Sequence, residues 1–356
     1  MLRIIFYNTV SFFIIILIFE IILTFLPVNQ GFEFYEVNKN SFIFRAKENR
    51  SITQSKYWNF YNPQIIKINN FGFRNNNNYD VKERNIVSVI GDSYVEAVQV
   101  PFAKTFYNIL EENIDNKFKV YSFGFSGAPL SQYLKWAEFS VDKFNVSHLV
   151  INVVANDFDE SLLKYKQSPG FHYFEKCDQS YCNVLVPYKK EKYKTILGKS
   201  NLVRYLVNNL QLLDINKNIS LFFEKLHNKK NIKNNKSYFA NTSTNNSIQR
   251  IEDSKLSVRL FLEKLSLIKL KKKNIILMID GRFYSSNYDG YFPLMREYFI
   301  KESIKRDFQV IDLKKSFDSE YKKNKKKFEF EKDGHWNPLG HSVVGKELHN
   351  FFNSNF

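Results

Sequence analysis

Runs of β-branched and aromatic residues alternate with longer amphipathic stretches through most of the chain. The apolar runs predict buried strands at residues 86–90, 118–123, 148–154, 274–279 and 308–313. The stretches between them predict helices at residues 130–144, 251–270 and 294–304, and another near residues 103–110. Strands that are apolar along their whole length and alternate with helices are typical of a parallel sheet covered on both faces. We therefore predict an α/β domain of three layers, with a five-stranded parallel sheet in the middle.

The most apolar segment is residues 4–26, interrupted only by Tyr7, Asn8, Thr9, Ser11, Glu20 and Thr24. At about 1.5 Å per residue, a helix of this length can cross a hydrocarbon core of roughly 30 Å. A cleaved signal peptide has a shorter apolar region, of roughly 7 to 15 residues, and a cleavage site with small residues. The sequence Leu26-Pro27-Val28-Asn29 offers no such site. The pattern therefore predicts an uncleaved anchor (1–27) that crosses the membrane once.

Glu20 lies within this segment, and an acid deep in lipid costs about 2.5 kcal/mol or somewhat more. The many Ile, Leu and Phe residues each return roughly 0.3 to 0.6 kcal/mol, so the sum favours insertion. Two interpretations of Glu20 stay open: it pairs with a partner helix, or it lies off centre and reaches toward the lipid head groups. Arg3 and the amino terminus favour a cytoplasmic N-terminus, which would place the rest of the chain in the periplasm or outside the cell.

Cysteine usage agrees with export. Cys177 and Cys182 are the only two cysteines, and the residues between them, Asp178-Gln179-Ser180-Tyr181, have the composition of a turn. A disulfide that closes this loop in an oxidising compartment fits best. The alternatives are a metal site, which lacks further ligands nearby, or two free thiols in a cytoplasmic protein.

The 356 residues carry a formal charge of +16. The lysines are scattered or lie in Asn-rich and Lys-rich stretches without a nucleic-acid-binding motif, which argues against a nucleic-acid partner. Anionic lipid head groups or an acidic polysaccharide suit an exported basic chain better, and biased codon composition explains the enrichment equally well. After the anchor we expect a lead-in segment (28–84) and an α/β domain (85–356). That domain carries two predicted insertions, an ordered one at about 159–199 and a mobile one, rich in Asn and Lys, at about 216–246.

Two short segments, far apart in the sequence, carry the residue types of nucleophilic catalysis. Gly91-Asp92-Ser93 directly follows the predicted strand at 86–90, and Asp333-Gly334-His335-Trp336-Asn337 lies near the C-terminus. A serine hydroxyl becomes a good nucleophile when an imidazole takes its proton, and a carboxylate fixes the tautomer of that imidazole. In open α/β sheets, ligands bind at the carboxyl ends of the strands. Ser93 is expected at such an end.

Four segments, in order, resemble the four sequence blocks of the SGNH (GDSL-type) hydrolase family. They are Gly91-Asp92-Ser93, Gly127 in Phe125-Ser126-Gly127, Asn156-Asp157 after the third strand, and Asp333 with His335. Upstream, Asn69-Asn70-Phe71-Gly72-Phe73-Arg74 also resembles a lead-in of membrane-anchored members. The resemblance implies the three-layer, flavodoxin-like fold of that family.

The resemblance also implies a role for each residue. Ser93 would attack an ester carbonyl, and His335 would act as general base and then as acid, oriented by Asp333. The backbone N–H groups of Ser93 and Gly127 and the side-chain amide of Asn156 would form the oxyanion hole. Taken singly, each residue has a structural explanation, because Ser93 and Asn156 can cap helices and Gly127 can be a turn residue. No cofactor or metal is implied.

The chain departs from the family pattern in two places. Many members have glycine two residues before the block III asparagine, where this chain has Val154. Many place the acid three residues before the histidine, a position held here by Lys332, so that the available acid is Asp333. This Asp-x-His-Trp form resembles exported polysaccharide O-acetyltransferases of the family. It shifts the expected substrate toward O-acetylated glycans.

The primary hypothesis is a membrane-anchored serine esterase that acts on O-acyl esters, with O-acetyl favoured, through an acyl-enzyme. With a sugar hydroxyl in place of water as acceptor, the same residues make a polysaccharide O-acyltransferase, for which a membrane protein would be the acyl donor. The second hypothesis, from a different class, is a catalytically silent scaffold that binds glycans.

Overall fold

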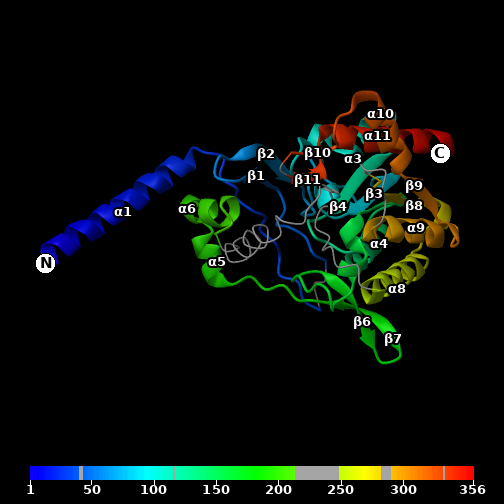
Figure 1. The fold of residues 1–356 in the computed structure, drawn as a ribbon, viewed down its shortest axis with the longest axis horizontal. Helices are drawn as coiled ribbons and strands as arrows, with labels where there is room; N and C mark the ends of the chain where they lie inside the picture. The colour runs from blue at the N-terminus through cyan, green and yellow to red at the C-terminus, as the bar shows by residue number, and fades with distance from the viewer. Residues whose placement is uncertain (40–42, 115–116, 213–247, 282–289, 332) are drawn as a thin grey trace, which may run out of the picture. The chain divides into compact units, whose positions relative to one another are not determined.

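The computed structural model describes residues 1–39, 43–114, 117–212, 248–281, 290–331 and 333–356 (Figure 1). The predicted insertion at 216–246 lies outside the described residues. The chain divides into two compact units. The first unit comprises residues 1–33, 50–67 and 190–236, and the second comprises residues 34–49, 68–189 and 237–356. The boundaries predicted after residues 27 and 84 differ from this division and stay a prediction.

A five-stranded parallel sheet forms the centre of the second unit. Its strands are β3 (Ile86–Gly91), β4 (Lys119–Gly124), β5 (Val146–Val153), β8 (Ile275–Ile279) and β9 (Gln309–Asp312), in the order β4-β3-β5-β8-β9. Each neighbouring pair is parallel. β3 and β8 are buried at every position, as expected for strands covered on both faces. The predicted strands and their common direction are confirmed, and their ends differ from the predicted ones by one or two residues.

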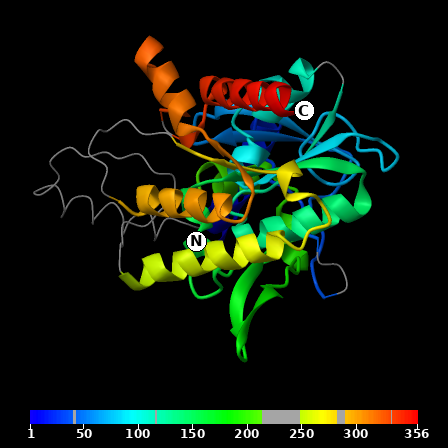
Figure 2. The same ribbon diagram turned by 90° about the vertical axis from the view of Figure 1, so that its right-hand side faces the viewer.

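Helices cover both faces of this sheet. One layer holds α3 (Phe106–Asn113), α10 (Lys314–Asn324) and α11 (Pro338–Asn355), and the other holds α4 (Leu130–Lys143), α8 (Ile248–Leu265) and α9 (Tyr291–Ile304). Figure 2 shows α11 on one side of the sheet and α8 on the other. The three-layer arrangement predicted from the sequence is therefore confirmed.

The ordered insertion predicted at about 159–199 contains an antiparallel hairpin of β6 (His172–Cys177) and β7 (Ser180–Leu185). Cys177 and Cys182 form the predicted disulfide across it. Two hydrogen bonds attach the hairpin to α4: Ser131 Oγ donates to the carbonyl of His172 (2.7 Å), and Asn183 Nδ2 donates to the carbonyl of Ser131 (2.9 Å). The hairpin is thus fixed to one of the helix layers.

The first unit contains α1 (Leu2–Thr24), β1 (Arg50–Lys56), most of β2 (Tyr61–Ile68), α5 (Lys192–Leu197) and α6 (Asn201–Arg204). α1 has an 18-residue window with a mean hydropathy of 2.3, none of which is buried, so the helix is long and apolar enough to cross a membrane. A signal sequence would pass the same test.

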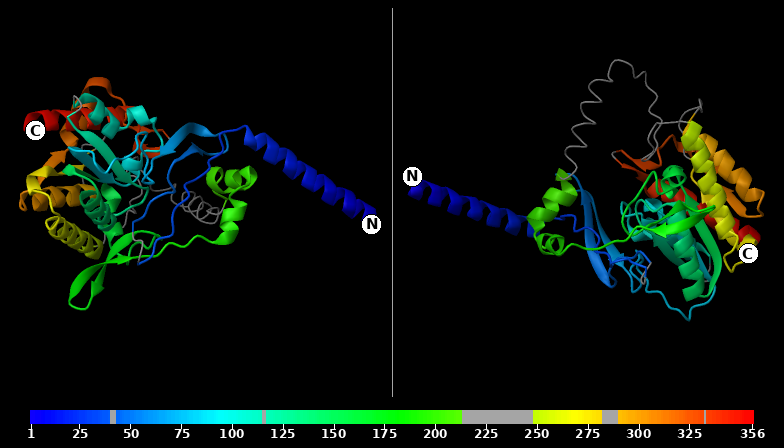
Figure 3. Two further views of the ribbon diagram at one scale, coloured as in Figure 1. Left: turned by 180° about the vertical axis from the view of Figure 1, so that it is seen from behind. Right: turned by 90° about the horizontal axis from the view of Figure 1, so that it is seen from below.

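Glu20, on α1, has its partners within the same unit. Its carboxylate accepts hydrogen bonds from Ser200 Oγ (2.7 Å), Asn201 N (2.7 Å) and Leu202 N (2.9 Å). The carboxylate therefore satisfies backbone N–H groups at the start of α6, which have no acceptor inside the helix. Figure 3 shows α6 beside the C-terminal end of α1. Neither interpretation of Glu20 from the sequence includes these intramolecular hydrogen bonds.

Asn29 connects the three segments of the first unit. Its Nδ2 donates to the carbonyl of Ser55 (3.0 Å), and its backbone N–H donates to Asn209 Oδ1 (2.9 Å). Its carbonyl accepts a hydrogen bond from Asn208 Nδ2 (2.9 Å). One residue just after α1 thereby holds both β1 and the end of the segment that follows α6.

Candidate active site

Ser93 lies where β3 ends and the short helix α2 (Ser93–Glu96) begins. Asp92 caps this helix, because its Oδ1 accepts a hydrogen bond from the backbone N–H of Tyr94 (3.0 Å). The turn is tight at Gly91, where a Cβ atom would lie 2.6 Å from Val95 Cγ2. The sequence Gly91-Asp92-Ser93 therefore suits a strand that passes directly into a helix and places its first residue, the buried Ser93, at the carboxyl end of the sheet.

His335 and Asp333 lie on β11 (Asp333–Trp336), which pairs with β10 (Glu329–Phe330). His335 Nε2 is 2.7 Å from Ser93 Oγ, and His335 Nδ1 is 2.5 Å from Asp333 Oδ1. A carboxylate beside Nδ1 stabilises the tautomer that carries its proton there, which leaves Nε2 free to accept the proton of the serine hydroxyl. The structure thus brings together the three residues predicted as a triad.

The segment that carries His335 is held on both sides. Asn337 caps α11 by accepting hydrogen bonds from the N–H groups of Leu339 (2.9 Å) and Gly340 (3.0 Å), with Pro338 at the first helical position. Tyr94, the residue after the serine, donates its hydroxyl to the carbonyl of Gly334 (3.1 Å). These contacts fix β11 relative to α2, and therefore the imidazole relative to the serine.

Gly127 lies in a turn directly after β4. The N–H of Ala128 donates to the carbonyl of Phe125 (3.1 Å), and Gly127 has a φ of 78°, which suits glycine as the third residue of a type II turn. The neighbouring Ser126 donates both its N–H (3.0 Å) and its hydroxyl to the carboxylate of Glu96. The turn is therefore held by a side chain that comes from the helix carrying Ser93.

Asn156 lies in a 3₁₀ turn (Ala155–Asp157) just after β5. Asp157 fixes this turn, since its carboxylate accepts hydrogen bonds from the N–H of Val154 (2.8 Å) and the hydroxyl of Tyr133 (3.0 Å). Asn156 Nδ2 donates to Glu160 Oε2 (3.1 Å), and the same carboxylate oxygen is 2.5 Å from Lys166 Nζ. Lys166 Nζ also donates to the carbonyl of Gly127 (2.9 Å), so the two predicted oxyanion-hole residues outside α2 are joined by an ion pair.

Three buried carboxyl groups surround the site. Burial raises the pKa of Asp92, against the hydrogen bond from Tyr94 and the charge of His335, which lower it. Burial raises the pKa of Glu96 to about 7, although the hydrogen bonds from Ser126 oppose the rise. Burial, reinforced by the charge of Asp92, raises the pKa of Asp157 well above its usual value. These raised pKa values show that the site disfavours negative charge. An oxyanion formed there would therefore need strong hydrogen-bond donors to stabilise it.

The other histidines have different surroundings. His341 is buried, accepts a hydrogen bond at Nδ1 from the N–H of Phe106 (3.3 Å) and stacks on the ring of Phe106, which is a structural role. His148 and His172 are buried away from the triad, and His227 lies outside the described residues. Within the described parts of the chain, no group of three His, Cys, Asp or Glu side chains could hold a metal ion.

Sequence reasoning missed four residues that hold the site together: Tyr94, Glu96, Glu160 and Lys166. Tyr94 and Glu96 directly follow the nucleophile block, so a helix there would have placed both beside Ser93. The lead-in residue Arg74 belongs to the same region, since its guanidinium donates to the carbonyls of Glu96 (2.8 Å), Ala97 and Val100 (2.6 Å). The lead-in thus supports the loop that follows α2.

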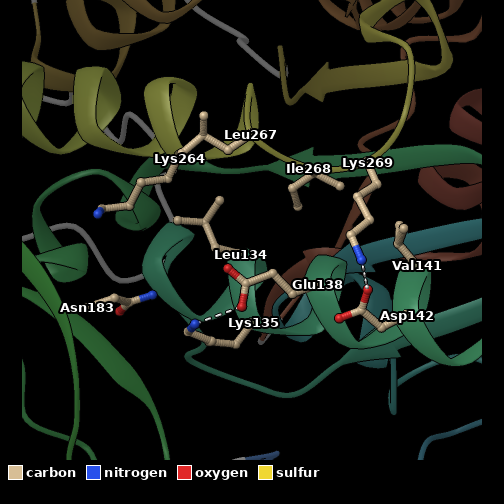
Figure 4. Close-up of a pocket in the computed structure, with 10 residues that line it drawn as sticks. All are labelled: Leu134, Lys135, Glu138, Val141, Asp142, Asn183, Lys264, Leu267, Ile268 and Lys269. Atoms are coloured by element: carbon tan, nitrogen blue, oxygen red, sulfur yellow. Dashed lines mark hydrogen bonds and ion pairs between the residues drawn. The ribbon is translucent and has the colours of Figure 1, made fainter.

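A hollow on the surface of the second unit lies between α4 and the end of α8 (Figure 4). Two ion pairs lie along it, Lys135 with Glu138 (2.7 Å) and Lys269 with Asp142 (3.5 Å). Its lining contains none of the residues of the triad or of the predicted oxyanion hole. The hollow is therefore a feature separate from the candidate active site.

No protein-family model matches the chain, and none of the curated proteins matches it. Solved structures do. The chain is similar to a member of the lipolytic G-D-S-L family from Veillonella parvula, with 11% identity over 75% of this chain and 98% of that one, at a TM-score of 0.41. It is similar to a lipase/acylhydrolase from Enterococcus faecalis, with 12% identity over 76% and 96% of the two chains and a TM-score of 0.40. A third similar structure is LAE5, an alpha/beta hydrolase from the metagenome of Lake Arreo, with 10% identity over 78% and 100% of the two chains and a TM-score of 0.42.

Proposed function

We propose that this chain is a serine-dependent ester hydrolase that acts on O-acyl groups. One observation carries the proposal: the continuous hydrogen bonds from Ser93 Oγ to His335 Nε2 (2.7 Å) and from His335 Nδ1 to Asp333 Oδ1 (2.5 Å). A nucleophile, a base and an orienting acid in hydrogen-bond contact are what acyl transfer through serine requires.

In the first half of the reaction, Ser93 Oγ attacks the ester carbonyl while its proton passes to His335 Nε2. The carbonyl oxygen becomes negative and accepts hydrogen bonds from the N–H groups of Ser93 and Gly127 and from Asn156 Nδ2. When the tetrahedral intermediate collapses, the alcohol leaves with the proton from His335. The acyl group stays on Ser93 as an ester.

In the second half, water attacks the acyl-enzyme while His335 takes a proton from it. Collapse of the second tetrahedral intermediate releases the carboxylic acid, and His335 returns a proton to Ser93 Oγ. Asp333 stays ionised throughout and stabilises the imidazolium. A sugar hydroxyl that took the place of this water would make the same chain an O-acyltransferase.

We infer O-acetylated glycans as the substrate class. The support is the form Asp333-Gly334-His335-Trp336, with the acid two residues before the histidine, which resembles that of exported polysaccharide O-acetyltransferases. The proposal includes an anchored enzyme, with α1 in the membrane and the second unit outside the cytoplasm. The Cys177–Cys182 disulfide supports a location of the second unit outside the cytoplasm, since disulfides persist in oxidising compartments.

The test uses the purified full chain in detergent with 4-nitrophenyl acetate as substrate. Ser93→Ala and His335→Ala are each expected to lower kcat by about 10⁴-fold or more. His349→Ala is the matched control: this histidine lies on α11 and hydrogen-bonds Asn353 (2.9 Å), and its loss is expected to leave the rate unchanged. A fluorophosphonate reagent is expected to label wild type and not Ser93→Ala.

Labelling that survives Ser93→Ala would show that another residue is the nucleophile. Equal background rates for wild type and Ser93→Ala, together with no labelling of either, would support the glycan-binding scaffold instead. Supplying a glycan with free hydroxyls as acceptor separates hydrolysis from transfer, because only transfer produces an acetylated glycan in mass spectra.

A further inference from the structure

The ion pair of Glu160 and Lys166 contacts two loops of the candidate active site at once. Glu160 lies in a 3₁₀ turn (Asp159–Ser161), and its Oε2 accepts a hydrogen bond from Asn156 Nδ2 (3.1 Å) while lying 2.5 Å from Lys166 Nζ. Lys166 Nζ donates in turn to the carbonyl of Gly127 (2.9 Å). The pair therefore joins the loop after β4 to the turn after β5.

Both partners of this pair are largely removed from water. The side chains of Glu160 and Lys166 are each 20% exposed, so the ion pair is screened less than one at the open surface. The backbone near Lys166 is also fixed, because its N–H donates to the carbonyl of Leu162 (3.3 Å). The charges are thus held at defined positions rather than on freely moving side chains.

We propose that Glu160 and Lys166 are positioning residues that set the geometry of the oxyanion hole; this inference rests on the proposed function. The amide nitrogen of Asn156 has two hydrogens. The bond to Glu160 uses one of them and fixes the rotation of the amide, so that the second hydrogen has one direction in which to donate to a substrate oxygen.

Lys166 acts on the other donor. Glu96 holds Ser126 on one side of Gly127, and Lys166 holds the carbonyl of Gly127 on the other side. The Ser126–Gly127 peptide group, which carries the N–H of Gly127, therefore has a restrained peptide group on each side. The N–H of Gly127 then keeps one orientation. The charge of Lys166 also acts on Asp92, the residue next to Ser93, where it opposes the burial that raises the pKa of that carboxyl group.

The size of the expected effect follows from the precision that such donors need. Loss of a whole oxyanion-hole donor costs about 10²- to 10³-fold in kcat, and donors act only at about 2.7 to 3.1 Å from the oxyanion. A donor that is present but loosely held should lose part of this benefit. We therefore expect Lys166→Met to lower kcat about 10- to 100-fold with KM changed less than about twofold.

The experiment measures kcat and KM for 4-nitrophenyl acetate and the rate of fluorophosphonate labelling with the full chain in detergent. Lys166→Met removes the charge and the donor, Glu160→Gln removes the charge but keeps an acceptor, and Lys166→Arg keeps the charge and donors. Lys166→Arg is expected to retain more activity than Lys166→Met. Glu160→Gln is also expected to lose less activity than Lys166→Met, because it keeps an acceptor for Asn156. Lys164→Met is the matched control, because Lys164 is half exposed and pairs with Asp253 (2.5 Å) instead.

The effect of Glu160→Gln with and without the side chain of Asn156 distinguishes a positioning role from a merely structural one. In an Asn156→Ala background, Glu160→Gln should cost less than it does in wild type, because the amide it orients is gone. Equal costs in both backgrounds, or wild-type kcat and labelling rate in both Lys166→Met and Glu160→Gln, would overturn the positioning role. Such a result leaves the proposed function intact so long as Ser93→Ala is inactive; activity in Ser93→Ala would instead remove the proposed function.

Discussion

Asp333 Oδ1 and His335 Nδ1 are 2.5 Å apart although a single glycine separates the two residues. Residues two apart on a strand point to the same face, so β11 presents the acid and the base side by side. The same carboxylate oxygen also accepts the backbone N–H of His335 (3.3 Å). The spacing that departs from the family pattern is therefore compatible with direct contact.

Replacing Asp333 by Asn should lower kcat by about a hundredfold or more, yet by less than His335→Ala does. Asn keeps the shape of the side chain but removes the negative charge that stabilises the imidazolium and the tautomer with a proton on Nδ1. The measurement is kcat with 4-nitrophenyl acetate. An Asp333→Asn enzyme as fast as wild type would show that another acid orients the histidine.

Replacing Glu20 by Leu should keep α1 apolar enough to cross a membrane and loosen the segment that contains α6. The change removes the acceptor of three hydrogen bonds from residues 200–202 and adds an apolar residue to α1. Trypsin cleavage after Lys199 and Arg204 is expected to become severalfold faster in the purified full chain. Thr9→Val serves as the control, because Thr9 Oγ1 donates only to the carbonyl of Ile5 within α1 (2.9 Å). Identical cleavage rates for Glu20→Leu and wild type would contradict the capping role.

Acid should destabilise the second unit partly through two buried histidines. Burial lowers the pKa of both His148 and His172 to about 4 from the ordinary value of 6.5. Between these values the unfolded chain binds protons that the folded chain does not, so the free energy of unfolding falls as pH drops from about 6.5 toward 4. Each histidine accounts for at most about 3 kcal/mol of this loss.

Thermal unfolding from pH 7.5 to 4.5 measures this dependence. A double variant, His148→Gln with His172→Gln, is expected to be less stable at pH 7.5 because packing is disturbed, but to lose stability with a shallower slope as pH falls. His349→Gln provides the control with one less histidine near the C-terminal end of α11. If the double variant and wild type showed the same slope, other groups would account for the acid sensitivity.

The sheet could be predicted from the sequence because its strands are continuous apolar runs. Residues 86–90 and 274–279 have almost no polar interruption, and burial on both faces is the only way to remove such runs from water. The contact between Ser93 and His335 was predictable for a chemical reason. A serine hydroxyl becomes a good nucleophile when an imidazole takes its proton, so the two residues had to meet. The start of α3 was less clear. Phe102–Lys104 form a 3₁₀ helix, and Thr105 adopts an extended backbone (φ −74°, ψ 144°) that separates it from α3, so the predicted helix is divided in two.

The remaining features depend on contacts that leave little trace in a local pattern. β1 and β2 were not predicted, because residues 50–56 and 61–68 mix polar and apolar side chains and most of their positions are only partly buried or exposed. Glu160 and Lys166 look like ordinary surface charges in the sequence, and only the turn between them brings them together. The partners of Glu20 lie about 180 residues away, so neither interpretation of that acid could include them.

The contacts of Asn29 bear on how a water-soluble version of this protein should be cut. A truncation that removes everything before residue 34 would delete not only α1 but also the residue that binds the carbonyl of Ser55 and the side chains of Asn208 and Asn209. β1 and the π-helix after α6 (Tyr205–Asn209) would then lose their shared partner. A version that begins between Phe25 and Val28 discards the apolar helix and keeps this junction, but it loses the carboxylate of Glu20 that caps α6. We expect it to resist proteolysis better than one that begins at residue 34.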